Sequence, residues 1–111
     1  MPTSLKKAAF APELHIPNGT YDISFYHRFG AVEIFSFKNE DGSIHVAELE
    51  IEGATFHLHE VVRWIASLEP QAAKGVTAVI GLFVDDVQEV FNRGIAAGAE
   101  SINPVTDHDY G

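Results

Sequence analysis

Cysteine is absent from this chain of 111 residues, and basic side chains are scarce. Without cysteine there can be no disulfide, no thiolate nucleophile and no zinc or iron–sulfur site with cysteine ligands. Seven lysine and arginine residues stand against 16 aspartate and glutamate residues, which gives a formal net charge of −9. Because a nucleic-acid partner requires a basic surface, this balance argues against one and favours a soluble protein.

Long hydrophobic runs are also missing. No run approaches the length of about 18 residues that a membrane span needs, and residues 1–10 lack the apolar centre of a secretory signal. We therefore expect no membrane partner and a cytoplasmic protein. Hydrophobic residues make up 46% of the chain, which is enough for the compact core of a single domain.

What the sequence does contain is an internal repeat with an offset of 68 residues. At this offset the Phe-Gly-Ala of residues 29–31 aligns with the Ala-Gly-Ala of residues 97–99, and Asn18 aligns with Asp86. Each copy reads as a short apolar strand, a polar cap, a helix and a closing Gly-Ala. A repeat of this kind indicates a fold built from two similar modules.

The first module reads as β-α-β-β-β. Asn18 and Thr20 offer capping oxygens before a short helix that stops at Gly30, and residues 39–42 form a hairpin turn. Hydrophobic periodicity predicts a strand at 10–16, a helix at 21–29, and strands at 32–37, 44–51 and 54–60.

The second module is incomplete. After a linker at 61–75, it has a predicted strand at 78–84, a helix capped by Asp86 and stopped by Gly98, and the start of a strand at 101–105. A full copy would reach about residue 128, so two strands are missing at Gly111. We therefore expect one α+β domain over 1–111, with module one at about 6–60 and the truncated module two at 76–111.

Strand alternation brings four polar side chains to one face of the predicted sheet. Glu13 and His15 share one side of their strand, and His57 and His59 share one side of theirs. Such a group can form a polar pocket wall that binds a ligand, a rebuilt metal site, or a general base. Trp64 is either a lid that stacks on an aromatic ligand or part of the core.

The chain resembles the vicinal oxygen chelate superfamily, the group of glyoxalases, bleomycin-resistance proteins and ring-cleaving dioxygenases. The signals are Ser-Phe-Tyr at 24–26 followed by Phe-Gly-Ala at 29–31, and Val-Asp-Asp-Val at 84–87 followed by Ala-Gly-Ala at 97–99. The resemblance covers essentially the whole chain. It implies paired βαβββ modules whose mixed sheets form a cup for a small molecule, commonly in a homodimer.

The resemblance also implies metal ligands on the first and last strands of each module. These positions correspond to Ala11, His57 and Val79, with a fourth beyond Gly111. Because only His57 of these side chains can bind a metal, and a stable site needs three or more protein donors, we expect no cofactor. A divalent metal bound through His57 is the alternative.

We therefore favour a small-molecule-binding protein of the glyoxalase/bleomycin-resistance type over an enzyme. It would lack the family metal and act as a homodimer, with its ligand in contact with Glu13, His15, His57, His59 and Trp64. One alternative is a metal-dependent lyase, isomerase or dioxygenase of the same superfamily. The other is an incomplete chain that assembles with a partner and has no active site of its own.

Overall fold

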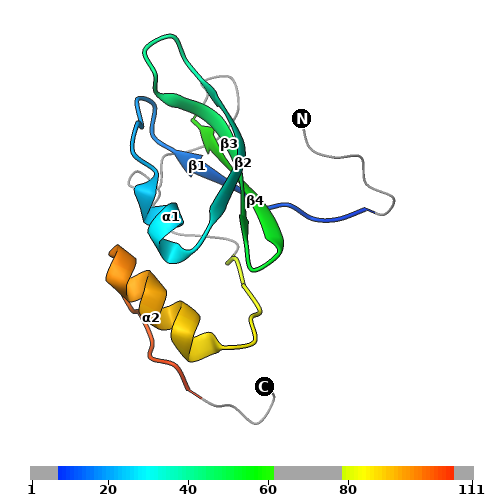
Figure 1. Cartoon of the computed structure of the whole chain (residues 1–111), viewed down its shortest axis with the longest axis vertical. Coiled ribbons are helices and arrows are strands. Elements are labelled where there is room, and N and C mark those ends of the chain that lie inside the picture. The colour runs from blue at the N-terminus through cyan, green and yellow to red at the C-terminus, as the bar shows by residue number, and fades with distance from the viewer. Residues whose placement is uncertain (1–7, 62–78, 107–111) are drawn as a thin grey trace.

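The computed structural model describes residues 8–61 and 79–106. In these residues the order of elements is β1 (Glu13–Ile16), α1 (Ser24–Phe29), β2 (Val32–Lys38), β3 (Ile44–Ile51), β4 (Ala54–Glu60) and α2 (Val87–Ala97) (Figure 1). The α+β class and the β-α-β-β-β order of the first module are confirmed. Within the same residues no helix is long and apolar enough to cross a membrane.

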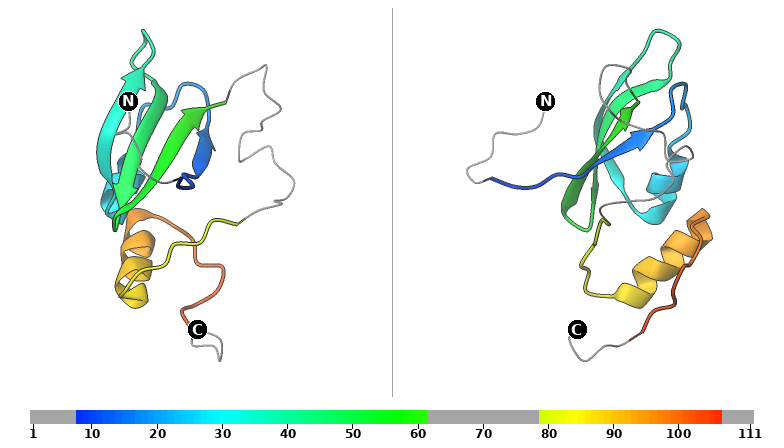
Figure 2. Two further views of the ribbon diagram at one scale, coloured as in Figure 1. Left: turned by 90° about the vertical axis from the view of Figure 1, so that its right-hand side faces the viewer. Right: turned by 180° about the vertical axis from the view of Figure 1, so that it is seen from behind.

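The four strands form one mixed sheet in the order β1-β4-β3-β2. The strand β1 runs parallel to β4, whereas the β2–β3 and β3–β4 pairs are antiparallel hairpins. Gly42 and Gly53 adopt positive φ angles of 88° and 83° in the two hairpin turns, a conformation that glycine reaches without strain. In Figure 2, α1 lies on one face of the sheet and α2 lies beyond the end of the sheet.

The core lies between the sheet and α1. Leu49 of β3 and Leu58 of β4 are completely buried, and burial of each such side chain contributes about 1.5–3 kcal/mol. Tyr26 and Phe29 of α1 pack against this cluster. The buried core residues of the first module are Ile16, Ile23, Ala31, Ile44, Ala47, Leu49, Ile51 and Leu58.

The two helices end in the same way, as the repeat predicts. Gly30 and Gly98 are both left-handed, with φ of 113° and 112°. After Gly30, the Ala31 N–H donates to the carbonyl of Tyr26, and after Gly98, the Ala99 N–H donates to the carbonyl of Gly94. These are equivalent bonds of a Schellman motif at an offset of 68 residues, so the sequence repeat corresponds to a structural repeat at the helix ends.

The helix starts agree with the sequence in α2 but not in α1. The Asp86 carboxylate accepts from the Glu89 N–H at 3.0 Å and caps α2 as predicted. In contrast, α1 begins only at Ser24, and Thr20 does not cap it. The Thr20 hydroxyl donates to the Pro17 carbonyl and the Asn18 amide to the Val61 carbonyl, because both side chains hold the turn after β1.

Two strands predicted for the second module are not formed. Residues 79–84 and 101–105 have no strand pairing in the structure, and α2 is the regular element that the second module contributes to the described chain. Their apolar patterns suit strands, but a strand requires a neighbour for its backbone groups. The first strand is also shorter than predicted and begins at Glu13, where its register with β4 starts.

Two reciprocal hydrogen bonds connect α2 to α1. Arg93 Nε donates to the carbonyl of Phe29 at 2.8 Å, and Arg28 Nη2 donates to the carbonyl of Ala97 at 3.2 Å. Phe29 and Ala97 are equivalent residues of the repeat, and each carbonyl belongs to a helix end that has no partner within its own helix. Each module therefore satisfies the helix terminus of the other.

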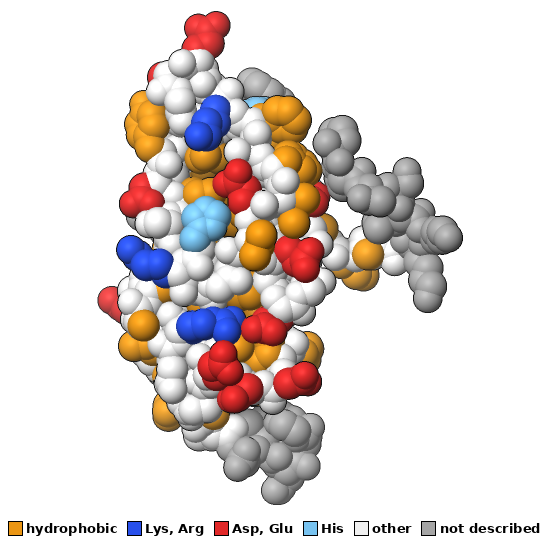
Figure 3. Space-filling view, in the orientation of Figure 1, with side chains coloured by type: hydrophobic (Ala, Val, Ile, Leu, Met, Phe, Trp, Pro, Cys, Tyr) orange, Lys and Arg blue, Asp and Glu red, His pale blue; other side chains and the backbone are white. Residues whose placement is uncertain are grey.

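Close packing accompanies these bonds. A Cβ atom added at Gly94 would lie 3.0 Å from Cε1 of Phe29, so glycine is what lets the ring reach the α2 backbone. Arg93 also forms ion pairs with Glu52 and Glu89. On the face drawn in Figure 3, acidic side chains gather around a basic one over this region.

We predict that Arg93→Ala lowers the free energy of unfolding by about 1–3 kcal/mol, because it removes a charged donor from the Phe29 carbonyl. Amide hydrogen exchange should accelerate throughout α2. Gln88→Ala is the matched control on the same helix, since that side chain bonds only Asn92. Equal effects of the two substitutions in urea denaturation would contradict the docking role of Arg93.

Candidate functional site

The four polar residues predicted to share a face do so in the structure. In the parallel register of β1 and β4, Glu13 lies beside His57 and His15 lies beside His59. The antiparallel register of β3 and β4 places Glu48 beside His57. We call Glu13, His15, Glu48, His57 and His59 the histidine face; it is the side of the sheet opposite Leu14, Phe56 and Leu58.

Glu48 and His57 form the best-defined contact on the histidine face. His57 Nε2 lies 3.0 Å from Glu48 Oε1, and Glu48 is only 7% exposed. When Nε2 donates its proton to this carboxylate, Nδ1 is left as a hydrogen-bond acceptor. No other described residue hydrogen-bonds to Nδ1, so this pair presents an oriented acceptor.

The other members of the histidine face have separate partners. His15 Nε2 lies 3.8 Å from a Glu13 oxygen, and this carboxylate is half exposed, so the pair contributes little to stability. His59 Nδ1 lies 2.6 Å from the Glu60 carbonyl oxygen and donates to it. The side chains are therefore neighbours on one surface but do not converge on one point.

Two aromatic rings of β2 continue the histidine face. Phe35 lies opposite Glu48 and Phe37 lies opposite Val46 in the β2–β3 register. Their ring centroids are 5.4 Å apart, and Phe37 is 51% exposed. Trp64, the predicted aromatic contact, lies outside the described residues.

The donors on the histidine face do not fit the metal site that the resemblance implies. The side chains of Ala11 and Val79 have no donor atom, so His57 is the one ligand at the three positions, and a single ligand does not hold an ion. Among residues 8–61 and 79–106, no group of three or more His, Cys, Asp or Glu side chains is arranged to hold a metal ion. We derive no metal chemistry for this surface.

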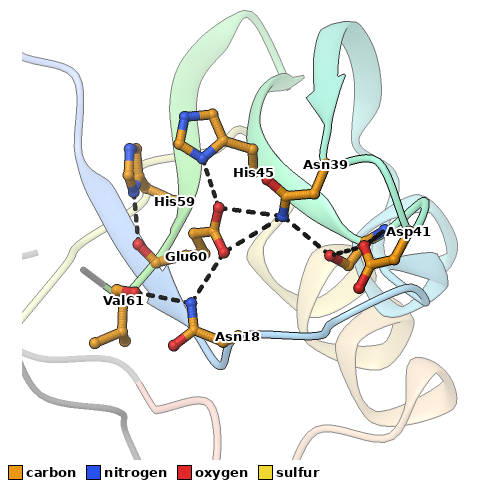
Figure 4. Close-up of polar contacts among 8 residues, drawn as sticks. Asn18, Asn39, Asp41, His45, His59, Glu60 and Val61 are labelled. Atoms are coloured by element: carbon orange, nitrogen blue, oxygen red, sulfur yellow. Dashed lines mark hydrogen bonds and ion pairs between the residues drawn. The ribbon is translucent and has the colours of Figure 1, made fainter. Parts of the chain in front are cut away.

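A network around Glu60 lies at the far end of β4 (Figure 4). Glu60 Oε1 accepts from the Asn18 amide at 2.9 Å, and Glu60 Oε2 accepts from Asn39 at 3.2 Å and from His45 Nδ1 at 2.6 Å. The network joins the end of β1, the β2–β3 turn and the start of β3 through one carboxylate. The sequence predicts that Asn18 caps α1, but in the structure its side-chain amide donates to Glu60 instead.

The hydrogen bond from His45 is the main reason that the pKa of the Glu60 carboxyl is lowered from its ordinary value of 4.5. Further hydrogen bonds from Asn18 and Asn39 lower it in the same direction, against the effect of burial. The Glu60 side chain is 13% exposed, so a structural role in holding three segments together accounts for these contacts.

An apolar cavity lies on the other side of the sheet. Its volume is about 770 Å³, and it opens between β1, β4, α1 and the segment before α2. Its walls are mainly apolar and are lined by Ala9, Phe10, Pro12, Leu14, Phe25, Tyr26, Phe29, Ile51, Gly53, Ala54, Thr55, Phe56, Ile80, Gly81 and Leu82. The histidine face does not contribute to it.

Comparison with known proteins gives relatives without an assigned function. No protein family model matches the chain. It is 32% identical over 107 residues to the uncharacterized protein Mb0911c of Mycobacterium bovis; the match covers 93% of this chain and 70% of that protein. The uncharacterized protein Rv0887c of Mycobacterium tuberculosis matches with the same identity, and the chain spans 63% of its length.

Solved structures show the same fold. TioX from Micromonospora sp. ML1 matches with a TM-score of 0.63 and 26% identity, over 94% of this chain and 81% of TioX. The Arabidopsis thaliana gene product At5g48480 matches with a TM-score of 0.62 and 18% identity, over 89% of this chain and 80% of that protein. Both likenesses support the glyoxalase/bleomycin-resistance-like fold that the sequence resembles.

We predict that Glu60→Gln destabilises the protein by about 1–3 kcal/mol near neutral pH, because it weakens the charged network. The folded-state pKa of Glu60 is lowered, so this contribution is fully present above the ordinary value of 4.5 and is lost as the pH falls below it. Urea denaturation of both proteins between about pH 7 and pH 3 measures the difference.

The exposed Glu100 has no partner among the described residues, so Glu100→Gln reports the loss of one charge alone. A difference between wild type and Glu60→Gln that grows as the pH falls through 4.5 would contradict the assigned role.

Proposed function

The chain belongs to the family of the mycobacterial protein Mb0911c, and from this premise we propose that it is a small-molecule-binding protein of the glyoxalase/bleomycin-resistance type. It binds its ligand on the histidine face without a metal ion, and it works as a homodimer. The observation that carries this proposal is the buried Glu48 carboxylate paired with His57.

A buried carboxylate is a poor source of stability. Removal of a carboxylate from water has a large free-energy cost that a single neutral partner does not fully offset. Glu48 nevertheless lies at 7% exposure in the middle of β3, where its contact is a partly exposed histidine. This arrangement is what a ligand-orienting pair requires, since the carboxylate fixes the imidazole and leaves Nδ1 free for a donor on the ligand.

The neighbouring rings indicate the chemical class of the ligand. The half-buried Phe35 lies beside Glu48, and its contact with the exposed Phe37 extends an aromatic surface from the Glu48–His57 pair. Each ring that stacks on a planar ligand contributes about 0.5–1.5 kcal/mol beyond its buried area. The ligand we propose is therefore a planar, aromatic molecule with a hydrogen-bond donor that reaches His57.

We predict that His57→Gln weakens binding of such a ligand about 10-fold while stability changes little. Glutamine places an amide near the position of Nε2 and keeps a partner for Glu48, but it has no counterpart of Nδ1, and one hydrogen bond accounts for this loss. Ligand-observed NMR with a library of planar heteroaromatic compounds identifies a binder, and titration calorimetry measures its affinity for each variant.

His27→Gln is the matched control, because His27 belongs to α1 and not to the histidine face. Removal of divalent ions with EDTA should leave the affinity unchanged. About one zinc, nickel, iron or manganese ion per purified chain, lost in His57→Ala, would contradict the proposal and support the metal-dependent enzyme instead.

The homodimer is proposed from apolar side chains that remain in water. Val79 and Phe83 are 85% and 98% exposed in the predicted strand segment before α2, and each leaves an apolar surface that association removes from water. We predict a solution mass twice that of the 12.1 kDa chain by light scattering. Phe83→Ser should shift the equilibrium toward the monomer, and a monodisperse wild-type monomer would contradict the dimer.

A further inference from the structure

We propose that the apolar cavity between the sheet and α1 is a second ligand site, which takes an uncharged aromatic molecule. This site goes beyond the function proposed above, because it lies on the opposite face of the sheet. Along β4, Ala54 and Phe56 line the cavity, whereas His57 belongs to the histidine face. A ligand in the cavity therefore does not touch His57.

The walls of the cavity are aromatic. Phe25 lies edge-on to Tyr26 with ring centroids 5.1 Å apart, and it stacks on Phe29 at 5.9 Å. Tyr26 in turn lies 5.9 Å from Phe56 of β4. These four rings come from α1 and β4, so the helix and the sheet together form a surface on which an aromatic ligand can stack or pack edge-to-face.

The absence of charge in the lining excludes charged ligands. No Asp, Glu, Lys, Arg or His contributes to the cavity wall formed by the described residues. An ionised ligand would lose its hydration there and gain no compensating partner, which is strongly unfavourable. The net charge of −9 on the whole chain adds a further penalty for anions.

Two hydroxyl groups supply the polar anchors. Tyr26 and Thr55 both line the cavity, and neither side chain forms a hydrogen bond with another described residue. Burial raises the pKa of the Tyr26 phenol, so this group stays a neutral donor at physiological pH. An uncharged ligand with one acceptor satisfies the Tyr26 hydroxyl without introducing a charge.

The shape favours a small molecule over a second copy of the chain. The cavity is concave and is lined by four separate segments: residues 9–14, 25–29, 51–56 and 80–82. Its volume of about 770 Å³ lies within the range of about 300–1,000 Å³ that is typical of ligand pockets. A self-complementary dimer contact is instead usually broad and shared by the same patch on both subunits.

The test uses a matched pair of fluorescent probes, neutral N-phenyl-1-naphthylamine and its sulfonated analogue 8-anilinonaphthalene-1-sulfonate. At about 0.5 M salt, which screens the net charge of the protein, the neutral probe should bind saturably at about one per chain. It should bind at least about 10-fold more tightly than the anion. Equal affinity of the two probes, or no saturable binding of the neutral one, would overturn the proposal.

Gly81→Phe locates the site. Gly81 lines the cavity, and nothing lies within 4 Å of a Cβ atom added there, so this position has room for a ring at the cavity wall. Gly81→Phe should therefore reduce neutral-probe binding at least about 10-fold. Gln88→Phe adds the same ring at an exposed position of α2, outside the cavity, and should bind as the wild type does. Gly81 is not part of the histidine face, so the His57-dependent ligand should bind Gly81→Phe normally, which separates failure of this site from failure of the proposed function.

Methyl NMR of the wild type locates the bound probe without any substitution, so it tests the site even if Gly81→Phe does not fold. The neutral probe should shift the methyl signals of Leu14 and Ile51 in the cavity but not that of Val46, which shares the side of His59. Shifts at Val46 alone would overturn the proposal. So would probe binding that disappears as the chain dimerises, since a second copy would then occupy the cavity.

Discussion

The alternation of side chains along β4 determines the chemistry of both faces of this sheet. The strand lies between β1, which runs parallel to it, and β3, which runs antiparallel to it. Leu58 is completely buried under α1, and the adjacent His57 is held by Glu48 on the other face. A shift of one residue in the register would exchange the two faces, so burial of the apolar set fixes the position of the polar set.

Among residues 79–106, the second module is held to the first through helix ends and not through strand pairing. The carbonyls of Phe29 and Ala97 are equivalent in the repeat, and each accepts from an arginine of the other module. Gly94 makes the approach possible because it leaves room for the Phe29 ring. A few charge-assisted hydrogen bonds and one close contact therefore orient α2, although the described residues of the second module contribute no strand to the sheet.

The sequence predicted features that depend on local geometry. The strand alternation, the two left-handed glycine stops and the Asp86 cap are all present, because each depends on residues within a few positions of one another. The strands expected at 78–84 and 101–105 are not formed by the described residues 79–84 and 101–105, because strand formation needs a partner that a local pattern does not specify. The shared face of Glu13, His15, His57 and His59 followed from parity alone.

Contacts between distant segments were beyond sequence reasoning. Glu48 lies between Ala47 and Leu49 in the sequence, so strand alternation places it on the opposite side of β3 from these two apolar residues. Only the β3–β4 register, however, identifies His57 as its partner. The Glu60 network joins residues up to 42 positions apart, and its members look like ordinary turn and cap residues in the sequence. The cavity is formed jointly by α1, β4 and residues 80–82, so the periodicity of any single segment does not predict it.

The two faces differ in the polar groups that they offer to a ligand. On the histidine face, the Glu48 carboxylate orients the imidazole of His57, and Nδ1 is left to accept from a donor on the ligand. The opposite cavity is lined by no carboxylate or imidazole among the described residues, and its one titratable group, Tyr26, has a pKa raised by burial. The polar groups of that cavity are therefore neutral hydroxyls. One strand thus separates a surface of carboxylates and imidazoles from an apolar one, and the separation is a direct consequence of the two-residue period of β4.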